Sequence, residues 1–461
     1  MLEPIRNILS RLKLGPRIEA DSFKSDVPTI TEGFLIGHCT DTGKPVCLDD
    51  NVMAQHLFVT GGTGAGKTVI GNNLIEHQIQ RGGGLLFIGT ADRYGFDEIY
   101  SQCVVHGRED DLLVFNPGDP SMSNTYNPLL IGSDQGSPSQ IANLVMLALY
   151  PDYEGSAVYP RQQVFADIRA IVSAMQAIDM IVNFSELADI LRNQKDLEDL
   201  KEDVKIIRGI DSDEYKHFAL FLDGFSVADE LGGERILDIA RINTLFGELA
   251  ARMNSFGSGD LGGLINVAEP EINLIEAIQG GKIIYVMLPP FGQMDFAMGV
   301  AKMFLANLSD CITALYELPM EQLPKLPFLC LKDEAFTYSS YLWVDLYRRA
   351  RGVNIILVSS AHTTLYPQDA PGDIVSKIAG HIGTKIILRM CSVAAAEDIV
   401  RLISLHGREG VVTADMILNL ALGEAFVMTR LKDGCVSIFK VKIPHAPRIH
   451  FATTPKIIHA N

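Results

Sequence analysis

Eight consecutive residues near the start of the sequence fill every position of the phosphate-binding template G-x-x-x-x-G-K-[ST]. In such a segment glycines let backbone N–H groups converge on phosphate oxygens, a lysine reaches the β- and γ-phosphates, and a hydroxyl group binds Mg²⁺. The motif therefore predicts a site for ATP and Mg²⁺, with Lys67 on the phosphates and Thr68 on the metal. Its members are Gly61, Gly62, Thr63, Gly64, Ala65, Gly66, Lys67 and Thr68.

Two acidic residues, Asp333 and Glu334, follow the apolar run 328–331. In a nucleotide-hydrolysing site we expect Asp333 to hold the Mg²⁺ shell and Glu334 to polarise the attacking water. Aspartate is also a favoured helix N-cap, which is the structural alternative. The presence of a complete phosphate loop earlier in the chain favours the hydrolytic pair.

Arg348, Arg349 and Arg351 come just before another apolar run, which ends at Ser360 and His362. Arginines at the end of a helix can simply complement its dipole. Alternatively, one of them is an arginine finger that stabilises charge on the γ-phosphate of a neighbouring subunit. Ser360 or His362 lies where a polar residue senses the γ-phosphate, although His362 is equally consistent with a surface histidine.

The spacing of apolar residues predicts the elements that position these groups. Short apolar runs alternate with helices at about 68–81, 94–106 and 295–316, which is typical of βαβ units with a parallel sheet. A long stretch of amphipathic helices interrupts this pattern at 136–258 and predicts a separate helical domain. The runs expected as strands are 57–59, 85–88, 112–115, 282–288, 328–331 and 353–358.

Composition limits the class of protein. The chain has 461 residues, 47% of them hydrophobic, and a net charge of −17, so any nucleic acid must meet a local basic patch or channel. The seven cysteines contain no C-x-x-C pair, which favours reduced thiols and a cytoplasmic location. No apolar stretch is long enough to cross a bilayer.

The N-terminal segment, residues 1–29, carries apolar residues at helical spacing and several basic residues. This pattern is typical of a short helix that lies on an anionic surface or docks to a partner. A solvated chain end is the alternative, since so short a helix is a marginal anchor.

Several motifs together resemble those of the type IV coupling proteins, the hexameric ATPases of conjugation and type IV secretion within the FtsK/HerA superfamily. They are the phosphate loop with the preceding residues 55–59, the stretches 113–119 and 126–129, the helical insertion, and Arg349-x-x-Gly352. The resemblance runs from about Gly33 to Pro444. It implies ATP and Mg²⁺ on Lys67 and Thr68, Asp333 and Glu334 as the second acidic motif, Arg349 as the trans-acting arginine, and Arg389 as a weaker extra candidate.

The sequence departs from the family pattern at three places. The glutamine usual after the post-arginine strand falls on Ser360, so sensing of the γ-phosphate is weakened or passes to His362. The Asp-Pro-Lys-Gly common after the second core strand is replaced by the segment 89–92. Most members carry an N-terminal membrane anchor; its absence predicts a soluble member or one that reaches the membrane through a partner.

The predicted architecture is α/β: a RecA-like P-loop NTPase core at 30–135 and 259–445, with an all-helical domain inserted at 136–258 and a tail at 446–461. The resemblance implies an ATPase, with DNA-stimulated translocase activity, that recruits DNA with its attached relaxase, or protein effectors, and delivers them to a type IV secretion channel. Two alternatives remain: an assembly or energising ATPase of the secretion machine, and a weakly hydrolysing docking platform.

The expected partners follow from the same resemblance. They are further copies of this chain in a homo-oligomer, expected to be a hexamer; single- or double-stranded DNA in its central channel; a relaxase or effector protein; and components of the secretion machine. The expected location is the cytoplasm, with peripheral contact at the inner membrane.

Overall fold

The computed structural model describes residues 33–90, 93–131, 134–149, 159–228, 235–288, 294–333, 341–361, 380–404, 410–431 and 434–444. Two residues expected at the site, Glu334 and His362, lie outside the described residues. The N-terminal segment 1–29 and the tail 446–461 also lie outside them.

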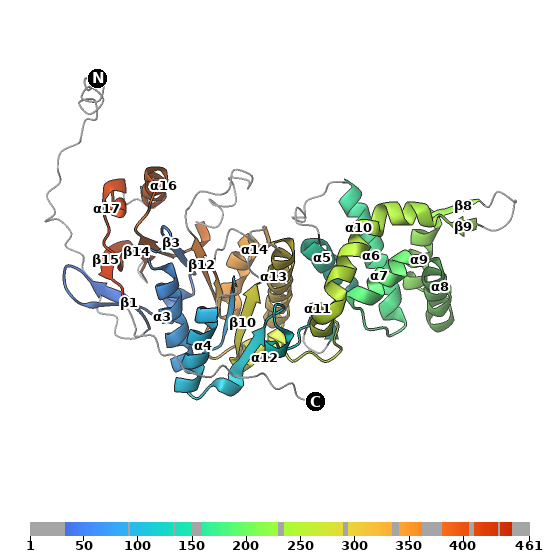
Figure 1. The fold of residues 1–461 in the computed structure, drawn as a ribbon, viewed down its shortest axis with the longest axis horizontal. Helices are drawn as coiled ribbons and strands as arrows, with labels where there is room; N and C mark the ends of the chain where they lie inside the picture. The colour runs from blue at the N-terminus through green and yellow to red at the C-terminus, as the bar shows by residue number, and fades with distance from the viewer. Residues whose placement is uncertain are drawn as a thin grey trace, which may run out of the picture.

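A large sheet forms the centre of the part of the chain outside the helical insertion (Figure 1). Within the described residues it has eleven strands, in the order β2-β1-β15-β14-β13-β3-β12-β11-β4-β10-β5. The apolar runs predicted as strands all form here, because a parallel strand covered on both faces must be apolar almost throughout. The strands are β1 (Phe34–Cys39), β2 (Pro45–Leu48), β3 (Leu57–Thr60), β4 (Leu85–Thr90), β5 (Leu112–Phe115), β10 (Ile283–Leu288), β11 (Phe328–Lys332), β12 (Ile355–Ala361), β13 (Thr384–Leu388), β14 (Glu424–Arg430) and β15 (Val436–Lys442).

The sheet has a parallel half and an antiparallel half. From β5 to β13 every neighbouring pair is parallel, so the carboxyl ends of these strands meet at one edge. Beyond β13, the strands β14, β15, β1 and β2 pair in antiparallel fashion. Ligands of open α/β sheets bind at the carboxyl edge of the parallel strands, and the phosphate loop follows β3 at this edge.

Helices cover both faces of the sheet. Alternate residues of β11 and β12 pack into two different cores, since successive side chains of a strand point to opposite faces. Helices α3 (Lys67–Gln80) and α4 (Arg93–Val105) cover one face, and α13 (Met294–Tyr316) and α14 (Tyr341–Arg349) cover the other. A smaller core lies under α16 (Val393–Ser404) and α17 (Ala414–Leu418), beside the antiparallel strands.

The helical unit projects from the α13 side of the sheet (Figure 1). It differs from the expected all-helical domain by one short hairpin, β8 (Ser226–Ala228) with β9 (Arg235–Leu237), which joins α9 to α10. Its first helix packs directly on α13, so its core is continuous with the core of that face. The helices are α5 (Pro138–Leu149), α6 (Tyr159–Ala177), α7 (Phe184–Arg192), α8 (Gln194–Arg208), α9 (Asp213–Gly224), α10 (Ile239–Gly257) and α11 (Gly259–Ile265).

The two connections between the helical unit and the sheet run side by side. The backbone N–H of Tyr126 donates to the carbonyl oxygen of Leu264 at 2.8 Å, and that of Ile272 donates to Thr125 at 2.9 Å. Below this junction, the short helix α12 (Leu274–Gly280) leads into β10. These hydrogen bonds hold together the segment that enters the helical unit and the segment that leaves it.

Contrary to the sequence expectation that no apolar stretch is long enough, one described helical segment, Phe296–Tyr316 within α13, is long and apolar enough to cross a membrane. Most of this segment is buried inside the protein, against the sheet and α5. Its composition is accounted for by its place in the core.

Candidate functional site

The phosphate loop connects β3 to α3 at the carboxyl edge of the sheet. Gly64 and Gly66 have φ angles of 72° and 112°, in the left-handed region that favours glycine. The ammonium group of Lys67 donates to the carbonyl oxygens of Gly61 and Gly62, at 2.9 and 3.2 Å. The lysine therefore lies back over the start of its own loop, where a phosphate group would compete for it.

The N-terminus of α3 is open to an anion. Its N-cap residue, Gly66, makes no side-chain hydrogen bond to the first turn. By contrast, Asn183, Asn193 and Ser212 cap the N-termini of α7, α8 and α9 with side-chain oxygens. An uncapped helix start behind a glycine-rich loop fits phosphate, because the free N–H groups and the helix dipole both favour negative charge.

Residues from far along the chain form one wall of the phosphate loop. The backbone N–H of Gly62 donates to the carbonyl oxygen of Arg389 at 2.9 Å. A β-carbon on Gly61 would overlap Leu388, and one on Gly62 would overlap the thiol of Cys391. The first two glycines of the motif are thus required by close packing on the end of β13, which local sequence patterns did not indicate.

Asp333 meets Ser360 beside this loop. Alternation along β11 and β12 places both residues on the α3 face, and the hydroxyl group of Ser360 donates to Oδ1 of Asp333. The backbone N–H of Asp333 donates to Ile88 at 3.0 Å, which holds the acid at the end of its strand. The structure thus brings Asp333 and Ser360 together at the edge that carries Lys67 and Thr68.

Lys332 points to the opposite face, toward α13. Its side chain is buried, and burial lowers its pKa to about 7, with the Lys302 ammonium group of α13 adding to the effect. Lys332 therefore does not share the face on which Asp333 meets Ser360.

Arg349 is engaged within its own subunit. Its guanidinium group donates to the hydroxyl groups of Ser309 and Thr313 on α13, at 2.5 and 2.9 Å, and pairs with Asp345 at 2.7 Å. The hydroxyl group of Tyr316, also on α13, donates to the carbonyl oxygen of Arg349 at 2.7 Å.

The Arg-x-x-Gly motif has a packing explanation in this chain. A β-carbon on Gly352 would overlap the Tyr316 hydroxyl group that binds the carbonyl oxygen of Arg349. Both ends of the motif therefore fit against α13. The glycine allows the close approach, and the arginine fastens the end of α14 to the same helix.

Arg351 instead lines a basic cavity of about 310 Å³ at the amino edge of the strands. Arg348, His381 and Arg430 share the lining, and among the described residues that line it none is acidic. His56 lies at its base: burial lowers the pKa of this histidine to about 4, and its ring bridges Tyr347 and the backbone N–H of Leu357.

The amino and carboxyl edges are separated by the length of β12. Arg351 precedes this strand, whereas Ala361 at its end accepts a hydrogen bond from the N–H of Gly61. A strand rises by about 3.3 Å per residue, so the two edges are on the order of 20 Å apart. Arg351 therefore lies too far from the phosphate loop of its own chain to contact a nucleotide bound there.

The described residues fit a nucleotide with Mg²⁺. The loop backbone and Lys67 would hold the phosphates, and Thr68, exposed at the start of α3, together with Asp333 supplies the oxygen ligands that Mg²⁺ prefers. Within the described residues no cluster of three or more His, Cys, Asp or Glu side chains is suited to a metal ion.

No family model matches this chain. It is 21% identical over 408 residues to the type 4 coupling protein DotL of Legionella pneumophila, an alignment that covers 79% of this chain and 51% of DotL. The chain therefore spans about half the length of this curated relative.

Solved structures show the same fold. The coupling protein TrwB, in complex with a non-hydrolysable GTP analogue, superposes with a TM-score of 0.64 at 14% identity, over 94% of each chain. TrwB with ADP and Mg²⁺ gives a TM-score of 0.62 at 14% identity over 92% of each chain. VirB4 of Thermoanaerobacter pseudethanolicus gives 0.54 at 15% identity, over 90% of this chain and 97% of that one. The fold is a RecA-like P-loop ATPase core with a helical insertion, and the chain resembles type IV coupling proteins in sequence and in fold, as its motifs predict.

Proposed function

We propose that this protein is an ATPase that recruits substrates, either DNA with an attached relaxase or effector proteins, and delivers them to a type IV secretion channel. One observation carries the proposal: the phosphate loop, with the uncapped N-terminus of α3 behind it, lies at the same sheet edge as Asp333 and Ser360. The fold around this edge is similar to that of a coupling protein. The sequence similarity to DotL supports type IV secretion as the setting.

Each residue of the site has a proposed role. Lys67 leaves the carbonyl oxygens of its own loop and neutralises charge on the β- and γ-phosphates. Thr68 and Asp333 would hold Mg²⁺, which would neutralise charge developing on the phosphates. Ser360 orients Asp333 through its hydrogen bond. Glu334 is proposed as the residue that polarises the attacking water.

The trans-acting arginine is proposed to be Arg351. Arg349, the residue that matches the family pattern, is held by Ser309, Thr313 and Asp345. Arg351 is exposed and lines the basic cavity at the amino edge. In a ring, this edge would meet the nucleotide edge of the next copy.

Substitution of the site tests the proposal. Lys67→Ala should abolish phosphate release while leaving the circular dichroism spectrum and melting temperature unchanged. Glu334→Gln should still bind ATP, because this residue is proposed to act on water and not on phosphate. Unchanged turnover in Lys67→Ala would remove the central claim, and loss of ATP binding in Glu334→Gln would mean that the acids have other roles.

The main alternative is an assembly or energising ATPase of the secretion machine. The structural similarity to VirB4 supports this alternative, although its TM-score is lower than that of TrwB. The two functions differ in their response to cargo. A coupling ATPase should be stimulated by single- or double-stranded DNA or by a delivered protein, whereas an assembly ATPase should respond to secretion components alone.

The proposed partners are further copies of the chain in a hexameric ring, the cargo, and the secretion machine at the inner membrane. With a net charge of −17, the protein would contact DNA through localised basic surface rather than through its overall charge. Mass measurement at several protein concentrations, with and without ATP and DNA, tests assembly. A chain that stays monomeric in all conditions would contradict the ring.

A further inference from the structure

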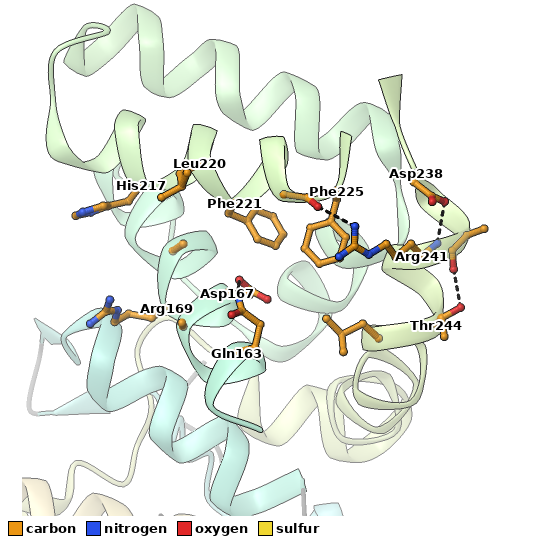
Figure 2. A pocket seen from close by; sticks show the side chains of 15 residues that line it. Gln163, Asp167, Arg169, His217, Leu220, Phe221, Phe225, Asp238, Arg241 and Thr244 are labelled. Atoms are coloured by element: carbon orange, nitrogen blue, oxygen red, sulfur yellow. Dashed lines mark hydrogen bonds between the residues drawn. The ribbon is translucent and has the colours of Figure 1, made fainter. Parts of the chain in front are cut away.

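The helical unit contains a cavity of about 990 Å³ between α6, α9 and α10 (Figure 2). Its floor has two aromatic rings, Phe221 and Phe225, which are buried and pack edge to face at 5.4 Å. Leu220, 71% exposed, stands on its rim. The volume and the apolar floor are those of a preformed ligand site.

A buried carboxylate faces this cavity. Asp167 on α6 is 4% exposed, and its Oδ1 accepts a hydrogen bond from the side-chain amide of Gln163 at 2.8 Å. Its Oδ2 has no hydrogen-bond partner among the described residues. Figure 2 shows Asp167 between Gln163 and the ring of Phe221, at the cavity wall. Burial raises the pKa of Asp167 to about 6, so the protein maintains this carboxylate at a cost in stability.

The charges around the mouth select the kind of donor that can reach Oδ2. Arg169 and His217 are exposed beside the cavity, on α6 and α9. Arg241 of α10 donates to the carbonyl oxygen of Gly224 and lies 5.2 Å from the Phe225 ring centre. Asp238 caps the N-terminus of α10, because its side-chain oxygen accepts a hydrogen bond from the backbone N–H of Arg241. At the mouth the two arginines, Arg169 and Arg241, outnumber the one carboxylate, Asp238, which disfavours an ammonium or guanidinium ligand and favours a neutral N–H donor.

We propose that this cavity binds a tryptophan side chain of a partner polypeptide, with the indole ring against Phe221 and Phe225 and the indole N–H donating to Oδ2 of Asp167. Indole combines a large apolar body with a single neutral donor, which is what the floor and the carboxylate together require. The open rim with Leu220 leaves room for the flanking backbone. The proposal rests on the proposed function only in that the partner is a delivered protein, and it can fail while the ATPase proposal stands.

Binding of a short peptide to the full chain tests the inference. The probe is acetyl-Gly-Ser-Trp-Ser-Gly-amide, measured by isothermal titration calorimetry, and the matched probe carries an N-methylated indole. Methylation keeps the ring but removes the donor, so it should weaken binding by about tenfold or more, since a buried acceptor is then left unpaired. Absence of binding at millimolar peptide, or equal affinity of the two peptides, overturns the proposal.

Substitutions of Asp167 provide a second, independent test of the proposal. In Asp167→Asn the amide oxygen keeps the bond from Gln163 and an N–H₂ group faces the ligand, and in Asp167→Leu the acceptor is gone. Both should lose peptide binding by about tenfold or more, keep ATP hydrolysis, and melt no lower than the parent protein. Leu220→Ser should weaken binding, whereas Ile206→Ser, equally exposed on α8, should not. Folded Asp167 variants that bind the peptide as the parent does would overturn the assignment.

Discussion

Separate replacement of Arg349 and Arg351 should damage two different properties. Arg349 makes two hydrogen bonds, to Ser309 and Thr313, and an ion pair with Asp345, and its side chain is 31% exposed. About 1 kcal/mol for each hydrogen bond and up to about 1 kcal/mol for the half-exposed pair give about 2–3 kcal/mol of stability. Arg349→Ala should therefore lower the melting temperature by about 2–3 °C and retain turnover at temperatures well below the transition.

Arg351→Ala should have the opposite effect. Its side chain is exposed, so its loss should change stability by less than about 0.5 kcal/mol. As a trans-acting arginine it should be worth up to about 10³-fold in turnover. The assay is steady-state phosphate release at a protein concentration where assembly has been shown, next to a thermal unfolding curve. Arg401→Ala, an exposed arginine on α16, is the matched control and should change neither.

Mixed rings distinguish a trans-acting residue from a local one. Arg351→Ala and Glu334→Gln, each inactive alone, should recover some activity when mixed, because some interfaces then pair an intact Glu334 with a neighbour's intact Arg351. The reasoning is refuted if Arg349→Ala is inactive at an unchanged melting temperature, which would make Arg349 the finger. It is equally refuted if assembled Arg351→Ala hydrolyses ATP at the parent rate.

Three further outcomes are expected. Gly62→Ala should lose nucleotide affinity by overlap with the Cys391 thiol, and Cys391→Ala, harmless alone, should restore part of it in isothermal titrations. Asp167 holds its proton in the folded state up to about pH 6, against a usual pKa of 3.8, so stability should fall as pH rises from about 4 to above 6, by up to about 3 kcal/mol. Asp167→Asn should abolish that fall in urea titrations and be the more stable protein at pH 7. Residues 150–257 can be replaced by a short linker, because the carbonyl oxygen of Leu149 accepts a hydrogen bond from Arg252, near the other end of the deletion, at 3.0 Å. This variant should still bind ATP but should no longer capture the delivered protein. Capture by this variant would place recognition elsewhere.

Much of the nucleotide edge could be predicted because its determinants are local. The phosphate loop needs a buried strand before it and a helix after it, and both are visible as apolar periodicity around Gly61 and Lys67. The place of Asp333 at the end of a strand was likewise predicted from the apolar run before it, whereas its position on the face opposite Lys332 is a finding of the structure. The parallel strands and the helical insertion followed from the same periodicities.

The remainder depends on contacts between distant parts of the chain. Nothing near Arg349 in the sequence shows that Ser309 and Thr313 on α13 will bind it, or that Gly352 is shaped by Tyr316. Asp167 occurs in an ordinary amphipathic helix, and its environment is created only when α9 and α10 pack beside α6. The short hairpin in the helical unit also lacked a signal, since its strands are too short for alternation to be recognised.

The packing of the phosphate loop against the end of β13 affects when this loop can take its final shape during synthesis of the chain. The motif at 61–68 leaves the ribosome early, but its first glycines pack on Leu388 and Cys391, and the N–H of Gly62 needs the carbonyl oxygen of Arg389. Contacts of such long sequence separation form late, since the chain between them must first be ordered. A nascent chain that ends before β13 contains the entire phosphate-binding motif but lacks the residues that pack against its first glycines, so we expect such a chain to bind nucleotide more weakly than the full chain.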